Sequence, residues 1–340
     1  MEQDGAPGAK EAGEGRAPSE ASKALLFLVF AFATAAGAAA GVSSGVFPEA
    51  VLNAWPLGVG VFGFLFVPGV DARRRGLYLG LAGAAFLLEL LGAEVPLPPF
   101  FLGLARLLLG GGVLWALGRR PVEALGATLA GARARELALA ALVGLLPTAG
   151  PWLALWLARP AVLAWNPAWR YAGEGGGAAA TALAGAAAIL FANTVVGEEA
   201  GWRGYLLREL RGRATRRRLV WGTALLFACW HLPFDLLVAR MDGPNLVVNA
   251  LTRYLMGLVY VHLFVGGRGS LLPVSVAHVA HNFVLYQLVG PRGLLATQPA
   301  GLEALVVVAG YLLGSLFWVF FLGRRARAAY AEWVRSEAGP

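Results

Sequence analysis

Hydrophobic residues in this chain occur in long runs rather than in the alternating pattern of a strand or the one-sided pattern of a surface helix. Each run is about 20 residues long, the length that an α-helix needs to cross the ~30 Å hydrocarbon layer of a bilayer. The pattern predicts an all-α, polytopic transmembrane bundle of about eight to ten helices. The expected spans are 24–45, 50–70, 76–93, 98–117, 136–158, 177–197, 219–239, 245–265, 271–289 and 302–322.

Composition excludes an ordinary soluble domain. Of the 340 residues, 58% are hydrophobic and only 14% are charged, whereas soluble domains carry about 25% charged residues. Residues 1–22 are rich in Gly, Ala, Glu and Pro without an apolar period, which predicts a disordered tail. Cys229 is the only cysteine, so the chain forms no intrachain disulfide and no thiolate metal cluster.

The positive charge is arranged for membrane orientation rather than for nucleic acid. The net charge is +8, but the basic residues lie at the ends of apolar runs and concentrate in alternate connections. This predicts ten crossings with both termini cytoplasmic, a lipid bilayer as partner and no nucleic acid. Lys10 and Lys23 are the only lysines and Ile189 is the only isoleucine, which indicates GC-rich coding and hence a bacterial inner (plasma) membrane.

Four regions follow from these patterns. They are the tail 1–22, transmembrane helices over 23–175, a core over 176–290 that holds most of the intramembrane polar residues, and a last transmembrane helix with a basic cytoplasmic tail over 291–340.

Ionisable side chains inside a membrane are costly, so each is a candidate for function. All four histidines lie between His231 and His281, and two adjacent carboxylates lie just upstream. If the helix continues past residue 197, Glu199 and Arg203 are i and i+4 and form an ion pair, while Glu198 is turned about 100° away. One carboxylate is then structural and the other free, although a solvated helix end with a salt bridge also fits this pattern.

Two later elements supply imidazoles. His231 lies ~18 Å along its span, so we expect it to be buried and to need a partner, for which a backbone carbonyl alone would suffice. His278 and Asn282 are i and i+4, so they share a helix face and both can donate to one bound atom. His281 lies close to this face as a supporting partner, a substitute ligand or a packing residue, and the sequence leaves these roles open.

Taken in order, the three elements resemble a known family. The strings are EExxxR (Glu198, Glu199, Arg203), FxxxH (Phe227, His231) and HxxxN (His278, Asn282). As an ordered set over about 185–290, they resemble the CPBP group of CAAX prenyl proteases and bacteriocin-processing (Abi) proteins, which are glutamic-type intramembrane endopeptidases.

This resemblance implies that 176–290 is a catalytic core that cleaves membrane-associated proteins or peptides without a cofactor. Glu198 with His231 would activate a water, because a carboxylate partly removed from water is a better proton acceptor. His278 and Asn282 would form the oxyanion hole, with Glu199, Arg203, Phe227 and His281 in support. We expect a polar pocket that opens to the cytoplasmic side.

Two alternatives remain at this point. Glu198, His231 and His278 also form the ligand set of an open catalytic zinc site, although they lack the HExxH spacing, and we favour the metal-free reaction. In the other alternative the polar residues form a packing network in a non-catalytic scaffold or a bacteriocin immunity protein. Relatives suggest protein maturation or removal of a C-terminal sorting signal, and the sequence decides neither the substrate nor the oligomeric state.

Overall fold

The computed structural model describes residues 20–46, 132–158, 192–284 and 302–336, together with ten single positions between Arg73 and Leu108. In these parts of the chain every regular element is a helix and no strand occurs, which confirms the all-α class. The span expected at 50–70 and the tail before residue 20 lie outside the described residues, as do most of the spans expected at 98–117 and 177–197. Of the span expected at 76–93, eight positions are described, all of them helical.

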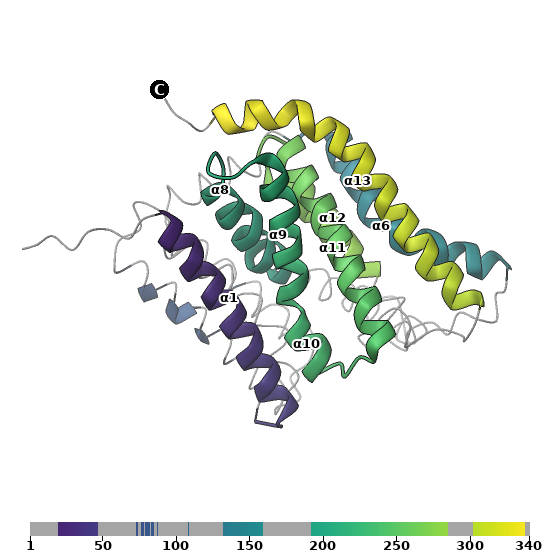
Figure 1. The fold of residues 1–340 in the computed structure, drawn as a ribbon, viewed down its shortest axis with the longest axis horizontal. Helices are drawn as coiled ribbons and strands as arrows, with labels where there is room; N and C mark the ends of the chain where they lie inside the picture. Colours follow the sequence, from purple (N-terminus) through teal and green to yellow (C-terminus); the bar gives the residue numbers. More distant parts are fainter. Residues whose placement is uncertain are drawn as a thin grey trace, which may run out of the picture.

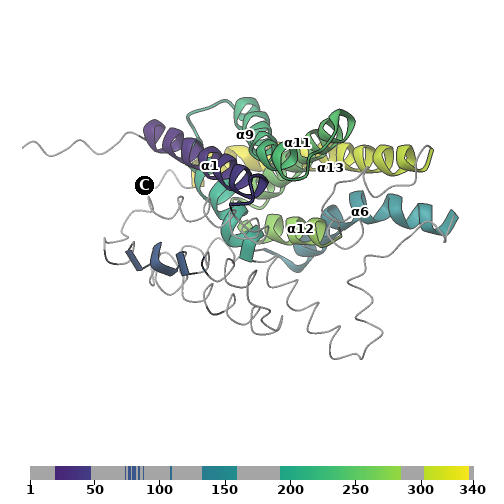
Figure 2. The same ribbon diagram turned by 90° about the horizontal axis from the view of Figure 1, so that it is seen from below.

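The helices form one bundle (Figures 1 and 2). Their bounds are α1 (Glu20–Ser43), α6 (Ala134–Ala158), the π-helix η3 (Ala192–Leu206), α8 (Leu207–Glu209), α9 (Arg216–Trp230), α10 (Leu232–Leu237), α11 (Gly243–Gly266), α12 (Leu271–Val284) and α13 (Leu302–Ser336). Four stretches among the described residues are long and apolar enough to cross a membrane, namely α1, α9 with α10, α11, and α13. The protein is therefore a membrane helix bundle.

The expected span 219–239 is confirmed as a stretch of membrane length, Arg216–Leu237, but it is divided into two helices. The helix α9 ends at Trp230, and α10 begins at Leu232. Pro233 causes the break, because proline lacks the N–H that would continue the α-helical ladder but is tolerated in the first turn of a new helix. His231 therefore lies at the junction, where it is both the C-cap of α9 and the N-cap of α10.

The last helix also differs from the expectation. We expected the span to end at residue 322 and a basic tail to follow, but α13 continues without interruption to Ser336. The basic residues beyond 322 are thus carried on a helix. In Figure 1, α13 (yellow) runs beside α6 along one edge of the bundle.

The core has two apolar clusters. The larger one surrounds α11, which packs against α9, α12 and α13. The smaller one joins α1 to the segment that carries the acidic pair, through Phe27 against Trp202 and Tyr205. The indole Nε1 of Trp230 also donates a hydrogen bond to the carbonyl of Ala31 at 3.0 Å. The N-terminal helix is therefore packed directly behind the polar segment.

One glycine sets the distance between α6 and α12. A Cβ at Gly144 would lie 2.9 Å from the carbonyl carbon of Ala277 and closer still to its oxygen. Any other residue at position 144 would push α12 away at the position directly before His278. Gly150, on the same helix, has nothing within 4 Å of the corresponding position.

We therefore predict that Gly144→Ala lowers the unfolding temperature of the purified protein in detergent, because overpacking a tight contact costs about 1–3 kcal/mol. Gly150→Ala is the matched control and should leave that temperature unchanged or slightly raised, since alanine favours a helix over glycine. Equal unfolding temperatures for the two variants would contradict the close approach.

Candidate active site

A buried carboxylate lies at the centre of the site. Glu199 is fully buried, and its Oε1 accepts a hydrogen bond from Nη1 of Arg203 at 3.0 Å. The same oxygen lies 2.6 Å from Nδ1 of His278, which belongs to α12. The guanidinium of Arg203 lies 4.4 Å from the ring centre of Phe227 and 5.3 Å from that of Tyr260. Glu199 thus neutralises an arginine and joins η3 to α12.

The expected ion pair of Glu199 and Arg203 is confirmed, but on a different kind of helix. The segment Ala192–Leu206 is a π-helix, not the α-helix that we expected to continue past residue 197. A π-helical turn is wider than an α-turn, and such turns are frequent at functional sites. Both Glu198 and Glu199 are buried on this helix.

Glu198 is the carboxylate that does not join the ion pair. Its Oε2 lies 4.0 Å from Nε2 of His231 and 3.8 Å from Nε2 of His278. The same oxygen is buried and accepts no hydrogen bond from any described residue. The structure therefore brings together the first acid and two imidazoles, as the sequence predicted, at separations that are too long for direct hydrogen bonds.

The opposite nitrogens of the two imidazoles fix their orientation. Nδ1 of His231 lies 2.8 Å from the carbonyl oxygen of Phe227, which can only accept, so Nδ1 carries the hydrogen. Nδ1 of His278 likewise donates to the carboxylate of Glu199. In the neutral rings Nε2 is then an acceptor. Three acceptor atoms therefore face one another, namely Oε2 of Glu198 and the two Nε2 atoms. Such an arrangement is stable only with a donor or a cation between them.

His231 is less deeply buried than expected, with 16% of its side chain exposed. Its bond to a backbone carbonyl is the simple structural role that the sequence left open, but that bond uses only Nδ1. The junction between α9 and α10 leaves Nε2 directed at Glu198. The residue therefore has a structural contact on one side and a candidate chemical role on the other.

Asn282 and His281 have separate contacts. The amide Nδ2 of Asn282 donates to the hydroxyl of Thr194 at 3.4 Å, one turn before Glu198 on η3. Asn282 thus reaches the helix that carries Glu198 but makes no hydrogen bond to Glu198 itself. His281 turns toward α13, with Nε2 at 3.2 Å from the hydroxyl of Tyr311.

Three residues that make contacts in or near the site were not predicted from the sequence. Tyr260 stacks on His278 with ring centres 4.5 Å apart, Tyr311 contacts His281, and Asp235 forms a buried ion pair with Arg253. A polar group within an apolar span was the available signal for each. That signal does not identify the partner, which in all three cases lies on another helix.

The geometry fits zinc poorly. Tetrahedral zinc with bonds of about 2.0–2.1 Å holds its ligand atoms about 3.4 Å apart, and both separations from Glu198 Oε2 exceed this value. Among the described residues, no group of three or more His, Cys, Asp or Glu side chains is arranged to hold a metal ion. We therefore derive no reaction step through a metal.

The buried pair makes a prediction about stability. Glu199→Gln leaves the guanidinium of Arg203 buried without a counter-charge, and breaking such a pair costs about 3–5 kcal/mol. We expect a marked drop in the free energy of unfolding, measured by denaturant titration in detergent. The control is Glu332→Gln, which breaks the exposed pair with Arg268 and should cost about 1 kcal/mol or less. Similar losses in both variants would refute the structural role of Glu199.

Comparison with known families places this site in context. Residues 180–284 match the family described as Rce1-like, type II CAAX prenyl endopeptidase Rce1-like. The matched segment contains η3, α9 and α12, and therefore all three motif elements. No curated protein matches the chain. The match confirms the predicted resemblance to the CPBP group, and over residues 180–284 this membrane helix bundle is similar to the Rce1-like family of type II CAAX prenyl endopeptidases.

Proposed function

We propose that this protein is an intramembrane endopeptidase that cleaves membrane-associated proteins or peptides, with Glu198 as the residue that activates water. The observation that carries the proposal is the convergence of Glu198 Oε2 with the Nε2 atoms of His231 and His278. A water between them would donate hydrogen bonds to acceptors that otherwise repel one another.

In the first step the water oxygen attacks the carbonyl carbon of the scissile peptide bond. One water proton passes to Glu198, with His231 holding the water by its Nε2. A carboxylate removed from bulk water is a stronger base than one in solution, so the burial of Glu198 favours this transfer. The proton held by Glu198 then passes to the leaving nitrogen as the C–N bond breaks, which returns Glu198 to its starting state.

His278 and Asn282 are the proposed donors to the oxyanion of the tetrahedral intermediate. The amide of Asn282 has two hydrogens, of which one goes to Thr194 and the other remains for the oxyanion. Nε2 of His278 donates only in the imidazolium form, for which the carboxylate of Glu199 beside Nδ1 provides a counter-charge. Donors fixed in a site of low dielectric stabilise such a charge by about 3 kcal/mol each.

The proposed substrates are membrane proteins or peptides that undergo maturation or lose a C-terminal sorting signal. We propose that the reaction needs no cofactor, and that zinc is not a participant. The expectation of a polar opening to the cytoplasmic side, and of cytoplasmic termini, stays part of this proposal.

We predict that Glu198→Gln lowers cleavage by at least about 100-fold, since it removes the general base while keeping the size of the side chain. The measurement compares the protein termini in membranes of cells that produce the native chain, Glu198→Gln or Glu332→Gln, and repeats the cleavage with purified protein. The unfolding temperature of Glu198→Gln should match that of the native protein. Full activity in this variant, or no cleavage by the native chain, would favour a non-catalytic scaffold or immunity protein.

A separate prediction concerns metal. Activity of the purified enzyme should survive prolonged treatment with a strong zinc chelator, and metal analysis should find less than one zinc per chain. Stoichiometric zinc together with loss of activity that added zinc reverses would replace the glutamate mechanism by a zinc mechanism. Both results can be read on the same preparation that establishes cleavage.

A further inference from the structure

A groove away from the catalytic residues is enclosed by α9, α11 and α13. Its volume is about 220 Å³, and its walls are mainly apolar side chains from the three helices. It contains neither Glu198 nor any residue of the three motifs. The groove therefore requires an explanation other than catalysis.

Charge is confined to one end of this groove. Arg216 and Arg217 begin α9, and Arg327 lies on α13 about 16 Å beyond Leu316 at 1.5 Å per residue. On α11 the order is the same, because the apolar Leu255 comes two turns before the polar His262 near the end of that helix. Each wall thus changes from polar to apolar in the same direction. A groove with this arrangement is complementary to an amphiphile with an anionic head group.

The three arginines are not balanced by an acidic partner in the part of the chain that the structure describes. Among the described residues neither Arg216, Arg217 nor Arg327 forms an ion pair with a carboxylate. A set of guanidinium groups at the mouth of an apolar groove is suited to bind a phosphate, because arginine matches phosphate oxygens with two hydrogen bonds at once. The groove is complementary to a negative group joined to a hydrocarbon chain.

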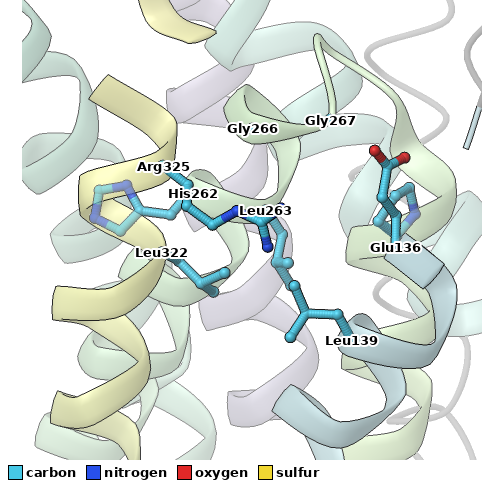
Figure 3. A pocket seen from close by; sticks show the side chains of 9 residues that line it. Glu136, Leu139, His262, Leu263, Gly266, Gly267, Leu322 and Arg325 are labelled. Atoms are coloured by element: carbon cyan, nitrogen blue, oxygen red, sulfur yellow. The ribbon is translucent and has the colours of Figure 1, made fainter. Parts of the chain in front are cut away.

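A neighbouring cavity differs from the groove in both volume and balance of charge. It shares His262 with the groove but has a volume of only about 60 Å³. Figure 3 shows that Glu136 and Arg325 both line it, so an acid accompanies the base. This cavity therefore lacks the unbalanced positive charge.

We propose that the groove binds one anionic phospholipid. Its phosphate lies at Arg216, Arg217 and Arg327, and an acyl chain lies along the apolar walls near Leu316 and Phe320. The opening faces hydrocarbon, since Phe320 is 71% exposed on a helix long enough to span the membrane. The bound lipid would connect α13, which lies outside the matched family segment, to α9 and α11 within it.

The test uses the full-length protein in mild detergent, titrated with phosphatidylglycerol or with phosphatidylcholine of the same chains and observed by native mass spectrometry. We expect one phosphatidylglycerol to be retained at least about tenfold more strongly than phosphatidylcholine. Arg217→Gln with Arg327→Gln removes two charges from the groove and should weaken that binding by about tenfold to thirtyfold. The matched control, Arg218→Gln with Arg324→Gln, removes two charges from the same helix regions outside the groove and should leave binding within about twofold.

Equal loss in both double variants would show diffuse surface charge and overturn the proposal. So would equal retention of the two lipids, or displacement of phosphatidylglycerol by inorganic phosphate or by an acidic peptide. If the groove variant does not fold, Leu316→Trp provides the second test, because it fills the groove without changing charge. That variant should also lose the lipid, and full retention would refute the site.

Discussion

The arrangement of the site depends on one buried carboxylate. Glu199 has no exposed surface, so its charge must be balanced inside the protein, and Arg203 on its own helix and His278 on α12 balance it together. This interaction fixes how η3 and α12 face each other. It also orients the ring of His278, so that the opposite nitrogen faces Glu198. The other carboxylate, Glu198, stays outside this ion pair, and its buried Oε2 accepts no hydrogen bond from a described residue.

The matched family segment is supported from outside its own limits. Helix α1 contacts Trp202 and Trp230, helix α6 meets α12 at the close contact of Gly144 with Ala277, and α13 holds His281 through Tyr311. Each of these contacts acts on a residue beside the candidate catalytic groups, not on the groups themselves. The helices outside 180–284 therefore determine how closely the elements of the site approach one another.

Much of the architecture followed from the sequence, because the membrane leaves a long apolar run few alternatives to a helix. The helices α1, α6 and α11 lie where the apolar runs placed them, and the pairing of Glu199 with Arg203 followed from a separation of four residues. The break at His231 was missed although Pro233 was visible, because apolar character continued across it. The helical continuation to Ser336 was missed because charge was interpreted as the end of the helix.

The sequence by itself thus determined the fold class, the membrane-length helices and the residues with candidate chemistry, since each of these depends on contacts within one helix or on transfer from water to lipid. Only the tertiary structure decided that His278 bonds Glu199, 79 positions away, that His281 turns to Tyr311, and that Asn282 reaches Thr194. Spacing along a helix fixes which side chains share a face. Which residues that face contacts depends on how whole helices are rotated and how closely they approach. Many side chains distributed over the chain determine that rotation and approach jointly.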